Sequence, residues 1–257
     1  MRLWSPVVWW ILSFSVAASE CPAQLRLAYN TTWLPYVEVT DEQVSGSDIE
    51  LIRQAVTQVG SELKLQYVPE KRAIRMLQQG LVDVLFAASY TPQRAEYAWF
   101  SAPYRKEHNV VLVRQQILQQ HPQLGQREAF LALAARKLVG AYNPAGYYGD
   151  EFEQVKQLPE VQRRSLAVYE PVRRLDLVSG DRADYTIVDS EAVHADLAQR
   201  SDQHKLLILP FYLNSADIHL MLGKKTIKQT CVIALNQVLT ARKKTLPTTG
   251  PSVLGSD

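Results

Sequence analysis

The chain has 257 residues, of which 47% are hydrophobic, and a formal net charge of +2. This length allows one large domain or two lobes with cores of their own, and the hydrophobic fraction is that of an ordinary globular protein. A charge so close to zero gives no support for an extended nucleic-acid-binding surface.

The N-terminal residues have the pattern of a cleaved secretory signal. A short positive start precedes an apolar run from Val7 to Ala18, and small residues follow it. Because this run is too short to span a bilayer stably, we interpret residues 1–19 as a signal peptide and not as a membrane anchor. Cleavage after Ala18 or Ser19 fits best, and cleavage after Ala23 also fits the small-residue rule. No later stretch is apolar enough to span a membrane, so we expect a soluble, periplasmic mature protein.

Beyond the signal, the predicted elements alternate between strands and helices. Strands are indicated by period-two alternation or by continuous apolar runs, and helices by apolar residues three and four positions apart. In chain order the pattern predicts a strand at 25–29, a helix at 48–59, a strand at 63–68, a helix at 71–79, strands at 82–87 and 110–114, a helix at 128–136, a strand at 138–141, a helix at 149–157, strands at 166–169, 185–188 and 218–222, and a long helix at 226–243. Such an order is typical of an α/β fold with mainly parallel sheets.

The chain contains two cysteines, Cys21 and Cys231. Export would place them in a compartment where disulfides persist, so they could pair and tie the N-terminus to the C-terminal helix. Cleavage after Ala23 would instead remove Cys21 and leave one free thiol. There is no Cys-x-x-Cys and the five histidines are scattered, so we predict neither a metal site nor a cofactor.

Two segments repeat one order of features, namely helix, glycine, aspartate, strand and polar loop. The first leads to Ser89 and the nearby Arg94, and the second ends at Asp189. Ligands of open α/β sheets bind at the carboxyl ends of strands. A cation on one such loop and a carboxylate on the other would suit a small zwitterion in a cleft between two lobes.

Six motifs occur in a characteristic order along the chain. They are Asn30-Thr31-Thr32-Trp33-Leu34-Pro35-Tyr36, Ser45-Gly46-Ser47-Asp48-Ile49-Glu50-Leu51, Gly80-x-x-Asp83, Thr91-Pro92-Gln93-Arg94, Phe100-Ser101-x-Pro103-Tyr104, and Gly180 through Asp189. Together they resemble the family-3 extracellular solute-binding proteins, the amino-acid receptors of ABC importers. The resemblance implies a type II periplasmic-binding-protein fold, with two α/β lobes joined by two crossing strands and a ligand enclosed between them by hinge closure.

The resemblance also implies a division of the chain. Residues 20–111 would form the first part of lobe 1, residues 112–213 lobe 2, and residues 214–245 the return to lobe 1 with the C-terminal helix. Residues 246–257 are expected to form a disordered tail. We expect a monomer that binds a small molecule and docks on an ABC permease.

The main ligand contacts implied by the resemblance come from the two charged loops. Arg94 would grip the ligand carboxylate with its planar fork, although it could also be a surface arginine at a helix start. Asp189 would receive the ligand ammonium, cap a helix, or do both. Ser89 and Thr91 would donate hydrogen bonds to the same carboxylate, and the alternative for Thr91 is a helix cap.

Further contacts are implied on both sides of the cleft. Trp33 would form an aromatic wall, unless it is a core residue, and Asn30 a polar pocket position. Asn143, Gly146 and Tyr147 would lie on a lobe-2 loop that closes over the ligand.

The sequence departs from the family pattern at two places. Arg72 follows Glu70 and Lys71 in a segment where many members have an aromatic residue, and it could pair with an acidic ligand group or be solvated. Tyr142 stands where some receptors have a lysine or another polar residue. The ligand could therefore differ from a standard amino acid.

Two aspartates of the motifs are interpreted as structural. Asp48 is expected to cap a helix, and Asp83 to fix a turn.

No enzyme motif accompanies these features. The sequence lacks a Gly-x-Ser-x-Gly elbow, a phosphate-binding loop and metal-ligand spacing. We therefore predict a binding protein, not an enzyme, that captures an amino acid or a similar small polar carboxylate. The alternatives are a sensor module of the same fold and a dehydratase-like periplasmic enzyme.

Overall fold

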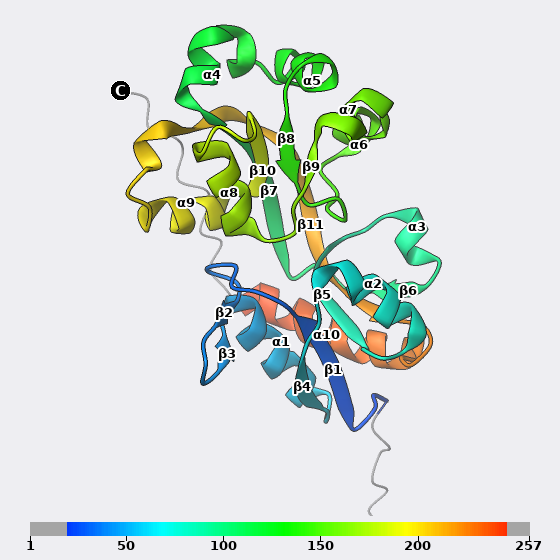
Figure 1. Cartoon of the computed structure of the whole chain (residues 1–257). Coiled ribbons are helices and arrows are strands. Elements are labelled where there is room, and N and C mark those ends of the chain that lie inside the picture. The colour runs from blue at the N-terminus through cyan, green and yellow to red at the C-terminus, as the bar shows by residue number, and fades with distance from the viewer. Residues whose placement is uncertain (1–19, 246–257) are drawn as a thin grey trace, which may run out of the picture.

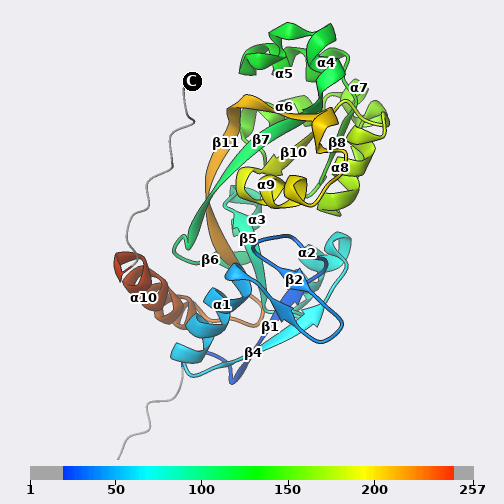
Figure 2. The ribbon, with the colours of Figure 1, turned by 90° about the vertical axis from the view of Figure 1, so that its left-hand side faces the viewer.

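The computed structural model describes residues 20–245, and the predicted signal peptide and tail lie outside this range. The chain forms two α/β lobes, one above the other in Figure 1. Two long strands, β7 (Arg105–Arg114) and β11 (Leu206–Gly223), pair with each other and run between the lobes (Figure 2). The predicted two-lobed α/β fold is confirmed.

Lobe 1 has a sheet covered by helices on both faces. Its strands are β1 (Gln24–Tyr29), β4 (Glu62–Tyr67), β5 (Val84–Ser89) and β6 (Ala98–Phe100), and a small hairpin is formed by β2 (Glu38–Val39) and β3 (Val44–Ser45). Its helices are α1 (Ser47–Gln58), α2 (Glu70–Gln79), α3 (Pro92–Ala95) and α10 (Gln229–Thr245). Apolar residues of α1 and α10 pack on one face of β1, and those of α2 pack on the other.

Lobe 2 repeats this layered arrangement. Its strands are β8 (Gly140–Tyr142), β9 (Leu166–Ala167) and β10 (Tyr185–Asp189). Its helices are α4 (Gln115–Gln120), α5 (Arg127–Arg136), α6 (Asp150–Gln157), α7 (Pro159–Arg164), α8 (Pro171–Ser179) and α9 (Ser190–Ala198), with short 3-10 helices at Pro122–Gly125 and Gln203–Lys205. Alternate residues of β7 face opposite layers, so Val111 and Val113 pack with α5 to α7 and Leu112 packs with α8 and α9.

The sheet is mixed, and the expectation of mainly parallel sheets was wrong. The strand order is β4-β1-β5-β11-β7-β10-β8-β9, with β6 paired to β11. The pairs β1–β4, β1–β5, β8–β9 and β8–β10 are parallel. Strands β7 and β11 run antiparallel to each other and to their other neighbours, and β2 and β3 are also antiparallel. The sequence pattern predicted only the apolar ends of β7 and β11, because polar residues such as Glu107 and Asn214 interrupt the hydrophobic pattern where the strands cross between the lobes.

Cys21 and Cys231 are joined by a disulfide between the segment before β1 and helix α10, with a Cα–Cα distance of 4.6 Å. Both residues are buried in the lobe-1 core. A bridge closing so long a loop stabilises the fold by about 5 kcal/mol in the chain-entropy model.

Asp48 does not cap α1 as predicted. The cap position is Gly46, whose φ is 116° and whose missing Cβ would lie 2.4 Å from Tyr36 O. This position therefore requires glycine. The buried Asp48 side chain instead accepts hydrogen bonds from Tyr104 Oη at 2.8 Å and from Arg105 Nε at 3.2 Å.

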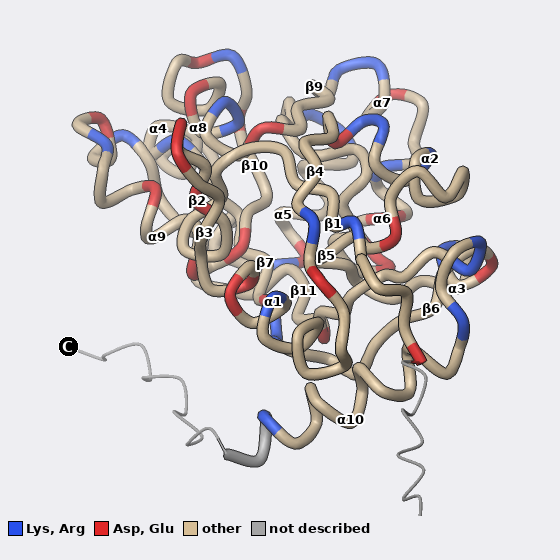
Figure 3. The backbone as a smooth tube through the Cα atoms, turned by 90° about the horizontal axis from the view of Figure 1, so that it is seen from below, with Lys and Arg blue, Asp and Glu red and all other residues tan. Residues whose placement is uncertain are grey.

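Basic and acidic residues are interspersed over both lobes, in agreement with the net charge of +2 (Figure 3). Within residues 20–245, no helix combines the length and apolar character needed to cross a bilayer.

Candidate ligand-binding site

A cavity of about 230 Å³ lies between the lobes and is lined by residues of both. The last residues of β1, β5 and β10, which are Tyr29, Ser89 and Asp189, all reach it. The carboxyl ends of these strands therefore meet at the cleft, as predicted. Because drug-sized ligands occupy pockets of about 300–1,000 Å³, this cavity suits a smaller molecule.

Most of the predicted ligand-binding residues converge on this cavity. Those that line it are Asn30, Trp33, Ser89, Arg94, Asn143, Gly146, Tyr147 and Asp189. The geometry thus brings together residues that lie up to 159 positions apart in the chain, from Asn30 to Asp189.

Arg72 and Thr91 do not line the cavity. Arg72 is exposed on α2, where the cavity side is formed by Glu70, Ala73 and Ile74. Residues three and four positions apart share one face of a helix, so Arg72 lies on another face. Thr91 caps α3, since its hydroxyl accepts a hydrogen bond from the Arg94 backbone N–H at 3.2 Å.

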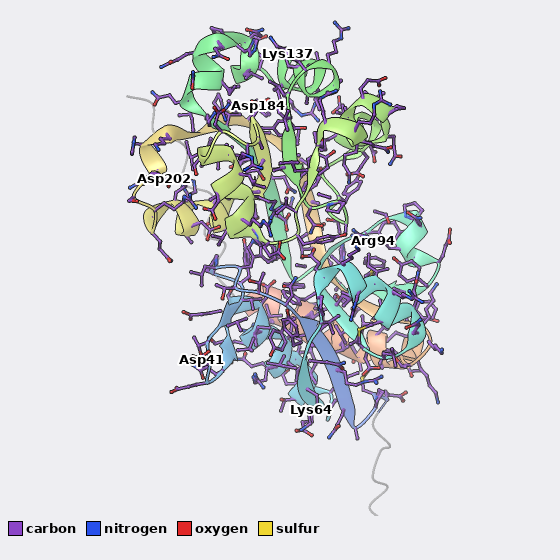
Figure 4. The ribbon with its side chains drawn as sticks, viewed as in Figure 1. Asp41, Lys64, Arg94, Lys137, Asp184 and Asp202 are labelled. Atoms are coloured by element: carbon purple, nitrogen blue, oxygen red, sulfur yellow. A yellow bond between two sulfur atoms is a disulfide. The ribbon has the colours of Figure 1, made fainter. Side chains whose placement is uncertain are left out.

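Arg94 connects the two lobes through backbone oxygens. Its Nη1 donates to Ser89 O at 2.8 Å, and its Nη2 donates to Ala145 O of lobe 2 at 2.7 Å. Figure 4 labels Arg94 on α3, at the level where the lobes face each other. Burial lowers the pKa of Arg94, and among the described residues it forms no ion pair. A half-buried guanidinium without a carboxylate is an unfavourable arrangement that an incoming anion would relieve.

Asp189 has one satisfied oxygen and one free oxygen. Its Oδ1 caps α9 by accepting the N–H groups of Glu191 and Ala192 at 3.1 and 3.0 Å. The same oxygen accepts the hydroxyl of Tyr36 in lobe 1 at 2.8 Å. Its Oδ2 is buried and has no hydrogen-bond partner among residues 20–245. The side chain therefore serves as a helix cap and still offers a carboxylate oxygen.

Sequence reasoning missed two further carboxylates of the cavity, Glu70 and Glu107. Glu70 accepts Asn30 Nδ2 at 3.1 Å and also Asn143 Nδ2 of lobe 2, and burial raises its pKa. Glu107 lies on β7, 3.4 Å from Arg105, and burial raises its pKa to about 7. The available signal was the alternation of Arg105 and Glu107, which places both on one face of a strand.

Arg105 holds the aromatic wall in place. Its guanidinium lies 3.9 Å from the ring centroid of Tyr36 and 5.3 Å from that of Trp33. The same guanidinium is paired with Asp48 at 3.2 Å. Trp33 is therefore both a cavity residue and a partly buried neighbour of the lobe-1 core.

The lobe-2 wall is a tight turn after β8. Asn143 Oδ1 accepts the Ala145 N–H at 2.9 Å, and Asn143 O accepts the Gly146 N–H at 3.1 Å. A Cβ at Gly146 would lie 2.5 Å from the Tyr148 hydroxyl, so a glycine is needed for this close approach. The turn presents Asn143 and the Ala145 carbonyl to lobe 1.

Metal binding finds no support in the described part of the chain, which contains no group of three or more His, Cys, Asp or Glu side chains that could hold an ion.

Solved structures of similar fold belong to several kinds of protein. The arginine-bound form of a truncated ArgBP from T. maritima has a TM-score of 0.68 and 19% sequence identity, and the match covers 86% of this chain and 96% of that one. A histidine kinase sensor domain with similarity to periplasmic binding proteins has a TM-score of 0.71, 15% identity, and coverage of 86% and 91%. An ancestral amino acid-binding protein, a precursor of cyclohexadienyl dehydratase, has a TM-score of 0.67, 18% identity, and coverage of 87% and 90%.

These identities establish the fold alone, and no curated protein matches the sequence. The family comparison is more specific, because the bacterial extracellular solute-binding proteins, family 3, match residues 25–245. This span contains both lobes, both crossing strands and every residue that lines the cavity. The chain belongs to the bacterial extracellular solute-binding proteins, family 3.

Proposed function

We propose that the protein captures an amino acid, or a similar small carboxylate, between its lobes and delivers it to an ABC importer. The observation that carries this proposal is the pair formed by Arg94 and Asp189. They come from different lobes and line one cavity, and neither forms an ion pair within the described residues. A zwitterion would supply both missing charges.

The ligand carboxylate is assigned to Arg94 and the ammonium to the free Oδ2 of Asp189. Hydrogen bonds to charged groups contribute about 1.5–3 kcal/mol each, and in a closed cleft they act with little competition from water. Ser89 lies at the end of β5 next to Arg94, and Trp33 covers the aliphatic part of the ligand. The turn at Asn143, Gly146 and Tyr147 closes the cavity from lobe 2.

Family membership and the N-terminal sequence support the proposed export and delivery. The signal-like residues 1–19 and the disulfide support a periplasmic protein, since disulfides persist outside the cytoplasm. We assign lobe 1 to residues 20–111 and 214–245, and lobe 2 to residues 112–213. We further propose a monomer that presents its closed form to a permease and releases the ligand chemically unchanged.

A sensor role uses the same binding chemistry, and the similar sensor domain makes it the second candidate. Permease and ATPase genes beside the coding gene would favour the importer, and a kinase or cyclase gene in their place would favour the sensor.

Isothermal titration of the mature protein with the twenty amino acids and small carboxylates tests the binding proposal. We expect saturable binding of at least one amino acid, which is recovered unchanged by chromatography afterwards. Failure of every amino acid and every small carboxylate to bind would overturn the proposal, and conversion of the bound ligand would favour the enzyme alternative.

A further inference from the structure

Glu70 is a cavity carboxylate. The α-carboxylate and α-ammonium of an ordinary amino acid, which are assigned to Arg94 and Asp189, would leave Glu70 without a charged partner. Asn30 Nδ2 of lobe 1 donates to its Oε2 at 3.1 Å, and Asn143 Nδ2 of lobe 2 donates to its Oε1. These two amides orient both oxygens of the carboxylate but carry no charge. Among the described residues Glu70 forms no ion pair, in contrast to Glu107, which is paired with Arg105.

The charges around the cavity differ in whether the protein itself compensates them, since Glu107 is paired with Arg105, which does not line the cavity. Those that line it belong to Glu70, Glu107, Asp189, Arg94 and Arg174. A zwitterionic ligand would use Arg94 and Asp189 and would add no net charge. Its α-carboxylate and α-ammonium would then be occupied. Glu70 would face the remaining part of the ligand, which is its side chain.

Arg174 acts on Glu70 through space but forms no direct ion pair with it among residues 20–245. Its Nη1 donates to Ile187 O at 3.3 Å and to the Tyr148 hydroxyl at 3.4 Å, and both acceptors belong to lobe 2. Burial raises the pKa of Glu70 more than the charge of Arg174 and the amide hydrogen bonds lower it. The carboxylate therefore remains short of positive charge where the ligand side chain would lie.

We propose that the ligand carries a second positive charge in its side chain and that Glu70 receives it. This inference rests on the proposed function and narrows the ligand to α-amino acids with an ammonium or guanidinium side chain. Tyr29, Tyr148 and Tyr169 line the same cavity, and aromatic faces attract cations. Each Glu70 oxygen accepts one amide hydrogen in the structure, and its remaining lone pair can accept a charged donor.

The test compares cationic ligands with neutral ligands of similar shape by isothermal titration. Arginine is matched with citrulline, and lysine with norleucine. For the wild type we expect arginine or lysine to bind about tenfold or more tightly than its neutral counterpart, as the gain of one charge-assisted hydrogen bond implies. In Glu70→Gln this preference should disappear, because the affinity for arginine or lysine should fall about tenfold more than the affinity for citrulline or norleucine.

Glu50→Gln is the matched control, because Glu50 occupies the first turn of α1 as Glu70 occupies that of α2, but it is exposed and outside the cavity. It should keep the preference for cationic ligands.

Equal loss for cationic and neutral ligands in Glu70→Gln would show that Glu70 only holds the lobes together, and would overturn the inference. A wild-type preference for glutamate would overturn the inference and would indicate that Arg174 contacts the ligand side chain. Tightest binding of a neutral amino acid would also refute the inference, but it would leave the proposed function intact. Binding of a small carboxylate but no amino acid would also refute only the inference, whereas binding of neither would refute the proposed function itself.

Discussion

Two half-buried arginines of lobe 1, Arg105 and Arg94, have opposite surroundings. Arg105 lies against the carboxylates of Asp48 and Glu107, at 3.2 and 3.4 Å, and over the ring of Tyr36. Within residues 20–245, the Arg94 guanidinium forms no ion pair and donates hydrogen bonds to the backbone oxygens of Ser89 and Ala145. The charge of Arg105 is therefore compensated within the fold, while that of Arg94 is compensated by dipoles alone.

This difference separates structural charges from charges that are available to a ligand. A buried ion whose partners are built into the protein fixes the positions of its neighbours, as Arg105 does for Trp33 and Tyr36. A buried ion that lacks an opposite charge is stabilised in the protein interior by hydrogen bonds alone. Asp189, with its free Oδ2, is the anionic counterpart of Arg94.

The largest effect is expected when the compensated arginine is removed. Arg105→Ala leaves the buried Asp48 without its cation, and breaking a buried pair in this way costs about 3–5 kcal/mol of unfolding free energy. Urea denaturation of the unliganded protein measures this loss. Arg94→Ala, examined in parallel, should lose much less stability, and equal losses in the two variants would contradict the distinction between them.

The second effect concerns binding and reverses the ranking of the two arginines. At a ligand concentration of a hundred dissociation constants, wild-type protein gains about 2.7 kcal/mol, or roughly 5–10 °C in melting temperature. Arg94→Ala should abolish this shift for carboxylate ligands, because the desolvated carboxylate would lose its charged partner. A thermal-shift titration measures this ligand-induced rise in melting temperature. Arg75→Ala is the control, because Arg75 is exposed on α2. A shift of wild-type size in Arg94→Ala would refute the carboxylate assignment.

The third prediction tests the anionic counterpart. Asp189→Asn keeps an oxygen that can cap α9 but removes the charge, so amino acids should bind about 1.5–3 kcal/mol more weakly. Analogues that lack the α-amino group should bind the variant and the wild type about equally. Calorimetric titration with one such pair of ligands distinguishes the roles. A similar loss for both members of the pair would indicate that Asp189 acts only as a cap and lobe contact.

The smallest effect is a change in the pH dependence of stability. Because burial raises the pKa of Glu107 from 4.5 to about 7, the folded protein binds this proton more tightly than the unfolded chain does. The stabilisation is complete below pH 4.5 and is lost as the pH rises toward 7. Glu107→Gln should make the decline across this interval shallower in urea denaturation, with Glu50→Gln as the control. Parallel curves for Glu107→Gln and wild type would contradict the buried position of this carboxylate.

The sequence predicted the elements whose pattern is local. Helices at 48–59 and 71–79 differ from α1 and α2 by only one residue at any end, because apolar spacing and a terminal glycine mark them. The crossing strands were underestimated, since the polar residues that line the cleft hide their strand pattern. Long-range pairing has no local pattern at all. The contact between Asp48 and Arg105 joins residues 57 positions apart, and sequence reasoning took Asp48 for a cap.

The site could be predicted to a similar extent. Arg94, Asp189 and Trp33 lie in motifs with a recognisable order, so their convergence on one cavity was anticipated. The sequence favoured Arg72 over Glu70, two positions earlier, because the local pattern does not show which face of α2 meets the cleft. Only the placement of α2 against Asn143, which comes from the other lobe, identifies Glu70 as the cavity residue.

A crystal structure with the tightest-binding amino acid tests the central claim most directly. We predict that the ligand carboxylate lies within hydrogen-bond distance of the Arg94 guanidinium and that its ammonium contacts Asp189 Oδ2, with Arg105 still paired to Asp48. A bound amino acid that touches neither Arg94 nor Asp189 would contradict the account.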